Sequence, residues 1–156
     1  MRAMTDILFY HLERQPLERV LPQLLQRTLE RGWRAVIETD SDDRVEALSA
    51  MLWTYTEEGF LPHGTARDGH AEDQPVWITA SNDNPNRASV RFFVGGAEPS
   101  AYEGLERAVL IFDGADADAI ERARRIWKDA KGQGHEVSYW QQDERGRWQN
   151  KAKSSD

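Results

Sequence analysis

The stretch AVLIFDGADADAIERARRIWKDAK, residues 108–131, joins a short apolar run to a longer amphipathic segment. Its first five residues are all apolar, which predicts a central strand buried on both faces of a parallel sheet. From about Asp116 to Lys131, apolar residues recur at helical spacing and predict a helix. A buried strand followed directly by a helix is the repeating unit of α/β folds.

The rest of the chain repeats this alternation of strands and helices. Pro22 lies inside the first predicted helix and should either kink it or mark a later start. Residues 57–74 show no period and predict a long loop. The expected strands are residues 7–10, 34–39, 76–80 and 90–94 with a closing pair at 137–141 and 147–149, and the expected helices are residues 16–31 and 42–52.

These elements together predict an α/β fold. We expect a three-layer α/β/α sandwich with a largely parallel sheet, Rossmann-like but without a nucleotide-binding motif. Residues 1–150 are expected to form a single domain, because the chain has the size of one compact unit and shows no linker. Residues 151–156 are polar and are expected to fray. The sequence has no signal-peptide pattern and no apolar run near the roughly 20 residues that cross a bilayer.

The composition excludes several classes of function. None of the 156 residues is a cysteine, so disulfides, thiolate metal sites and cysteine nucleophiles are excluded. The absence of cysteine also fits a cytoplasmic protein. A formal net charge of −7 repels nucleic-acid phosphates, so we expect no strong direct nucleic-acid binding unless a local basic patch opposes that charge.

One segment carries the opposite charge. Residues 119–131 hold five cations against two carboxylates, a net charge of +3, which leaves −10 on the rest of the chain. At about 100° per residue, Arg124, Lys128 and Lys131 share one stripe of the predicted helix, and Trp127 borders it. This arrangement suits an acidic peptide with an apolar end, because guanidinium groups bind carboxylates beside an apolar ring. Alternatively, the cations complement the helix dipole and the Trp belongs to the core.

The sequence offers little for catalysis or nucleotide binding. The first strand-to-helix junction, HLERQP at residues 11–16, lacks the glycines of either phosphate-binding loop. Glu38 and Asp40 follow the second strand, where a ribose-binding acid would lie, but without those glycines we interpret them as loop and cap residues. We expect no catalytic residue, no cofactor and no metal. The alternative is an enzyme that uses the His63–Asp73 loop, which gathers two histidines and three carboxylates.

Two adjoining segments resemble a known protein family. EALSAMLW at residues 46–53 and GFLPHG at residues 59–64 are similar to a family pattern in which a helix ends in Leu-Trp and Phe-x-Pro-His follows. Over about residues 5–148 the chain thus resembles the chi subunit of DNA polymerase III. Four further features follow in the family's order: Phe9-Tyr10 in the first strand, the helix end at Arg31-Gly32, the strand at 107–113 and the helix with Trp127-Lys128.

The resemblance implies a non-catalytic adaptor in DNA replication, acting within the DNA-directed DNA polymerase holoenzyme. It also implies a site for the acidic C-terminal tail of single-stranded-DNA-binding protein, which ends in Pro-Phe and a free carboxylate. Some members have a further Lys where this chain has Ile120, and Lys131 or Arg125 is expected to replace it. The implied site residues are Arg124 and Lys128 as basic grips, Trp127 where the family often has Tyr, and Trp53 as a pocket wall.

The resemblance implies a second partner as well. This partner is the psi subunit or another protein on the clamp-loader side, and in some members a helicase-like protein uses the same surface. Phe60 and Leu61 match the region that reaches such a partner. Alternatively, both residues are buried anchors of the long loop. The residues alone also leave open an adaptor for a different acidic partner, and no membrane partner is expected.

Overall fold

The computed structural model describes residues 5–54 and 63–153. Strands and helices alternate as the sequence predicts. Of the described helices, none is both long and apolar enough to cross a membrane. In chain order the elements are β1 (Asp6–Leu12), α1 (Leu17–Glu30), β2 (Ala35–Glu38), α2 (Asp42–Thr54), β3 (Gly64–Thr65), a short 3-10 turn (Ala71–Asp73), β4 (Val76–Thr79), β5 (Val90–Phe93), β6 (Arg107–Asp113), α3 (Ala117–Gly132), β7 (Glu136–Gln142) and β8 (Trp148–Lys153).

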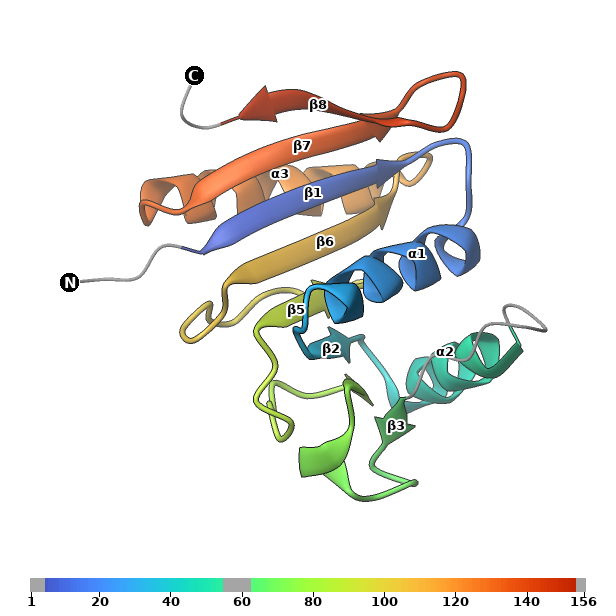
Figure 1. Cartoon of the computed structure of the whole chain (residues 1–156). Coiled ribbons are helices and arrows are strands. Elements are labelled where there is room, and N and C mark those ends of the chain that lie inside the picture. The colour runs from blue at the N-terminus through green and yellow to red at the C-terminus, as the bar shows by residue number, and fades with distance from the viewer. Residues whose placement is uncertain (1–4, 55–62, 154–156) are drawn as a thin grey trace.

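The strands of the described residues form one sheet in the order β3-β4-β2-β5-β6-β1-β7-β8. Neighbouring strands are parallel except for β7 and β8, which are antiparallel. Helices α1 and α2 lie on one side of the sheet and α3 lies on the other (Figure 1). The predicted three-layer fold with a largely parallel sheet is therefore confirmed. The apolar run at 108–112 belongs to β6, which lies in the sheet interior between β5 and β1.

Strand β1 supplies side chains to two separate cores. Leu8 and Tyr10 pack into the core beneath α1 and α2. Ile7 and Phe9 pack into the core beneath α3. Successive strand residues point to opposite faces of a sheet, so one strand with apolar residues at every position can serve both cores.

Helix α1 begins after Pro16 and is followed by a glycine turn. The helix is unbroken from Leu17 to Glu30 with Pro22 buried inside it, so the expectation of a later start is wrong. Pro22 lacks the N–H that would bond to the carbonyl of Glu18, so α1 loses one backbone hydrogen bond at this point. Gly32 has a φ of 82°, a left-handed conformation that glycine adopts without strain and that turns the chain into β2.

Two stretches differ from the sequence prediction. The predicted loop 57–74 contains β3 and the 3-10 turn, both too short to produce a periodic pattern. Strand β8 continues to Lys153, beyond the point at which fraying was expected, because its backbone pairs with β7 up to Ser138. Phe60 and Leu61 lie outside the described residues.

A buried ion pair joins the neighbouring strands β2 and β5. Arg91 is 5% exposed, and its Nη2 and Nε atoms lie 2.6 Å and 2.9 Å from Oε1 of Glu38. The same guanidinium donates to the carbonyl oxygens of Ser81 and Asp83, which ties the loop after β4 to the sheet. Burial raises the pKa of Glu38, although hydrogen bonding and charge from Arg91 oppose the rise.

Replacing Arg91 by alanine should lower the free energy of unfolding by about 3 kcal/mol, the low end for a buried pair, because it leaves the partly buried Glu38 carboxylate without its partner. Arg44→Ala is the matched control, since Arg44 forms an exposed pair with Asp40 at 3.0 Å and should cost less than about 1 kcal/mol. Urea unfolding followed by circular dichroism measures both. Equal losses in the two variants would contradict a structural role for the buried pair.

Candidate partner-binding site

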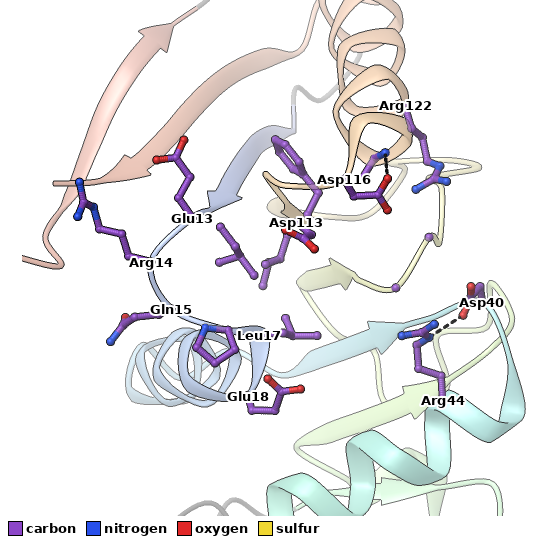
Figure 2. Close-up of a pocket in the computed structure, with 17 residues that line it drawn as sticks. Glu13, Arg14, Gln15, Leu17, Glu18, Asp40, Arg44, Asp113, Asp116 and Arg122 are labelled. Carbon is purple, nitrogen blue, oxygen red and sulfur yellow. Dashed lines mark hydrogen bonds and ion pairs between the residues drawn. The ribbon is translucent and has the colours of Figure 1, made fainter. Parts of the chain in front are cut away.

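A cavity of about 700 Å³ opens at the carboxyl ends of the central strands (Figure 2). The chain leaves β1 for α1 on one face of the sheet, and it leaves the adjacent β6 for α3 on the other face. In open α/β sheets, ligands commonly bind where neighbouring strands are connected to opposite faces in this way. A nucleotide-binding protein of this fold would therefore hold its nucleotide here.

The lining of this cavity does not suit a phosphate. Asp116 accepts hydrogen bonds from the amides of Asp118 and Ala119, so a carboxylate already occupies the α3 N-terminus that would otherwise receive an anion. The nucleotide hypothesis gains no support from this geometry. The charged lining residues are the carboxylates Glu13, Glu18, Asp40, Asp113 and Asp116 and the cations Arg14, Arg44 and Arg122.

Residues 63–73 use several of their polar groups within the fold. His63 is buried beside Trp53, with 5.1 Å between the ring centroids. Asp68 accepts hydrogen bonds from the amide and the hydroxyl of Thr65. Across the two described ranges, no three His, Cys, Asp or Glu side chains gather as potential metal ligands. The enzyme alternative for this loop therefore gains no support from a metal site among the described residues.

The cations of α3 divide into a paired and an unpaired group. Arg122 and Arg125 both face Glu98: Arg122 Nε lies 3.8 Å from its carboxylate, and Arg125 donates to it. The other cations of the helix form no ion pair within the described part of the chain. The protein therefore leaves the charge of the predicted stripe unneutralised. The members of this exposed, unpaired group are Arg124, Lys128 and Lys131.

Trp127 connects this stripe to the sheet. Its ring centroid lies 5.3 Å from that of Phe9 in β1 and 6.5 Å from that of Tyr139 in β7. Trp127 is only partly buried, so one side of the indole packs on the core and the rest remains accessible. The structure therefore brings four predicted residues together. We define the α3 patch as Arg124, Trp127, Lys128 and Lys131 of α3 together with Tyr139 of β7.

Sequence reasoning missed the aromatic side chains that extend the α3 patch. The Tyr139 ring lies 6.2 Å from Phe112 and 5.7 Å from His11. The alternation along β7 could have placed Tyr139 on the α3 side, because it follows the buried Val137 by two residues. Its neighbours come from β1 and β6, and no single segment reveals that β1 lies next to both β6 and β7.

Hydrogen bonds fix the orientation of Tyr139. Its hydroxyl bonds to Nδ1 of the buried His11, whose Nε2 lies 3.2 Å from the Glu13 carboxylate. The Tyr139 hydroxyl can donate to Nδ1, and an Nε2–H group can donate to the carboxylate. Burial raises the pKa of Tyr139, and the charge of Glu13 adds to the rise while Arg124 opposes it. The phenol is therefore protonated at neutral pH, and its ring is held against the edge of the patch.

Trp53 does not join this patch. It lies near the end of α2 with 55% of its surface exposed, and α2 is on the opposite side of the sheet from α3 (Figure 1). Its ring contacts His63, the first described residue after the gap. The two groups of residues that the resemblance implied for one pocket therefore lie on opposite faces of the molecule.

Comparison with known proteins identifies the family. A family profile described as "DNA polymerase III chi subunit, HolC" matches residues 4–138. The chain belongs to the DNA polymerase III chi subunit family. One relative, "Probable DNA polymerase III subunit chi" from Rickettsia prowazekii (strain Madrid E), is 26% identical over 111 residues, which cover 71% of this chain and 67% of the relative. The resemblance identified in the sequence is thereby confirmed.

Membership of the chi family gives the chain a role in DNA replication as an accessory subunit of DNA polymerase III. It also implies a partnership with other subunits of that polymerase. The matched range includes all of α3 and ends at Ser138, so Tyr139 lies just beyond it.

The packing of His11 can be tested at Gly114. Gly114→Ala would place a Cβ atom against the imidazole and 2.8 Å from the carbonyl oxygen of Leu12, and such overpacking should cost about 1–3 kcal/mol of unfolding free energy. The control is Gly132→Ala in α3, where no atom lies within 4 Å and helix propensity should add about 0.5–1 kcal/mol. Thermal unfolding measures both variants. A shift of the melting temperature in the same direction in both would contradict close packing of Gly114 against His11.

Proposed function

We propose that this chi-family protein binds the acidic C-terminal tail of single-stranded-DNA-binding protein through the α3 patch, and thereby links that protein to the clamp-loader complex. The observation that carries the proposal is a row of exposed, unpaired cations beside a partly buried indole, in a chain with a net charge of −7. Family membership supports a partner within the replication machinery.

The α3 patch matches the two chemical features of such a tail. Arg124 and Lys128 offer charge-assisted hydrogen bonds to carboxylates, and the planar guanidinium can bind a terminal carboxylate with two parallel bonds. The rings of Trp127 and Tyr139 offer apolar surface for an aromatic side chain at the tail's end. Because the side chains of Arg124 and Lys128 are exposed, their electrostatic attraction to the tail should weaken as salt is added.

The opposite face supports a second contact. Trp53 exposes a large apolar surface on α2, and exposed Trp residues are enriched at binding hot spots. Phe60 and Leu61, expected to reach the psi subunit or another clamp-loader-side protein, follow α2 in the chain and lie outside the described residues. With the tail on one side of the sheet and this partner on the other, neither would block its counterpart.

A synthetic acidic peptide ending in Pro-Phe should bind the intact chain with a Kd on the order of 1 μM, about −8 kcal/mol. Arg124→Ala and Lys128→Ala should each weaken binding about ten-fold or more, because each removes a cation without another partner. Arg125→Ala removes the same charge from the same helix but takes it from Glu98, so it should have little effect. Calorimetry at two salt concentrations, with a C-terminally amidated peptide as a further arm, measures these affinities.

Two results of this titration would contradict the site assignment. One is normal peptide affinity in both Arg124→Ala and Lys128→Ala. The other is an equal loss in Arg125→Ala, which would indicate attraction to overall charge and not to the α3 patch. If the amidated peptide binds as tightly as the free acid, the α3 patch does not recognise the terminal carboxylate of the tail.

Trp53→Ala should separate the two faces. The variant should keep normal affinity for the tail peptide, because Trp53 belongs to α2, which lies on the other side of the sheet from α3. It should lose co-elution with clamp-loader-side subunits in size-exclusion chromatography, because truncation removes the exposed indole. A loss of tail-peptide affinity as large as that of Arg124→Ala would return Trp53 to the tail pocket and overturn the two-face arrangement.

A further inference from the structure

A second cationic site lies on the α1 side of the sheet, away from the α3 patch. Three arginines surround a cleft of about 150 Å³ between the end of α1 and strands β1, β5 and β6. Arg27 belongs to the last turn of α1, Arg31 follows that helix, and Arg107 opens β6. We call this group the arginine cleft. Tyr10, which points away from α3, forms part of its wall.

No carboxylate among the described residues neutralises the arginine cleft. Arg27, Arg31 and Arg107 form no ion pair within residues 5–54 and 63–153. The Nε atom of Arg107 is buried and has no hydrogen-bond acceptor. A buried charged donor without an acceptor is costly, so hydrogen bonding of this atom within the described residues does not account for the placement of Arg107.

An aromatic ring holds two of these cations in place. The guanidinium carbons of Arg31 and Arg107 lie 5.3 Å and 5.4 Å from the ring centroid of Trp33. Such contacts limit the rotamer freedom of both arginines before any ligand binds, which reduces the entropic cost of binding. Burial raises the pKa of Tyr10, while the charges of Arg107 and Arg27 oppose the rise. Both cations therefore lie close enough to the Tyr10 hydroxyl to affect it electrostatically.

Helix stabilisation does not account for the whole group. Cations at the end of α1 complement the helix dipole, which is a sufficient reason for Arg27 and Arg31. Arg107 comes from the start of strand β6 and not from the helix whose end it approaches, so helix propensity and capping do not account for its presence. Its side chain nevertheless converges on the same cleft, and its orphan Nε donor remains unexplained by any contact within the described residues.

Aromatic rings continue from the cleft across the sheet, beginning with the buried Tyr10 and ending with two tryptophans. The Tyr10 ring lies 6.1 Å from Trp140 of β7, nearly parallel to it, and 4.7 Å from Trp148 of β8, edge to face. Both tryptophans are only partly buried. In Figure 1, α1 crosses the β5–β6 part of the sheet, and no described helix covers the same side of β7 and β8. Cations beside accessible rings are the combination that binds single-stranded nucleic acid, because phosphates meet cations and bases stack on rings.

We propose that the arginine cleft binds a backbone phosphate of single-stranded DNA, with neighbouring bases on the partly exposed rings of Trp140 and Trp148. The cleft is too small for a nucleoside but has room for one anionic group. Three guanidinium groups can surround the oxygens of a phosphate, whereas a carboxylate presents two oxygens in one plane. The net charge of −7 keeps the affinity low, so the contact acts on DNA that other proteins already hold nearby.

Fluorescence anisotropy of a labelled oligothymidine, titrated with the full chain at low salt, tests this assignment. The test variant is Arg27→Ala/Arg31→Ala, because both side chains are exposed and their removal should leave the fold intact. It should weaken binding by about ten-fold or more and lower the slope of log affinity against log salt by about one to two. The matched control is Arg19→Ala, which removes an exposed cation of α1 outside the cleft and should change affinity less than about two-fold.

Arg107→Lys provides a second measurement, because it keeps the charge but removes the Nε donor and the planar guanidinium. Weaker DNA binding in this variant with unchanged thermal stability supports a phosphate contact by the Arg107 guanidinium. DNA affinity equal to that of the unmodified chain overturns it. Tail-peptide affinity should be unchanged in all of these variants, so failure of this proposal is distinguishable from failure of the α3 patch.

Further titrations with inorganic phosphate and with an acidic peptide test whether the anion in the cleft belongs to DNA, to free phosphate or to a protein. No oligothymidine binding at low salt overturns the proposal, and so does an equal loss in Arg19→Ala. Inorganic phosphate that quenches tryptophan fluorescence as strongly as the oligomer would make the cleft a free-phosphate site instead. An acidic peptide that binds more tightly than the oligomer, with the same dependence on Arg27 and Arg31, would assign the cleft to a protein partner.

Discussion

The burial of β1 on both faces of a parallel sheet is the constraint on which the arrangement of this protein depends. Alternate residues of one strand fill two cores, so the helices must lie on both sides. Surfaces on the two sides are consequently separated by the full thickness of the sheet. A small domain with this construction can present two chemically different faces, which is the geometric requirement for an adaptor in a multi-protein machine.

The number of cations on α3 does not by itself indicate a binding surface, because some of them form ion pairs within the protein. Five cations occur within residues 119–131, but Glu98 engages two of them, and Arg124, Lys128 and Lys131 remain without an ionic partner in the described chain. The same distinction applies on the α1 side, where cations lie around Trp33. In an acidic protein, a cation that is left unneutralised indicates a surface suited to an anionic partner, whereas a paired one contributes mainly to the local fold.

The sequence predicted the alternation of elements, the interior strand at 108–112 and the stripe on α3, because these follow from periodicity within single segments. It missed features that depend on long-range pairing. The contact of Trp127 with Tyr139 requires α3 to cross β7, and the separation of Trp53 from α3 requires knowledge of which face each helix covers. Strand β8 extends past the expected fraying point because β7 supplies hydrogen-bond partners that no local pattern encodes.

The cavity at the ends of β1 and β6 has a geometric origin. It forms wherever adjacent parallel strands send their connections to opposite faces, so any sequence with this topology would contain a similar hollow. Its presence alone is therefore poor evidence of a ligand. What distinguishes this hollow is that Asp116 closes the helix end inside it, as an internal substitute for the anion that related architectures recruit from solution.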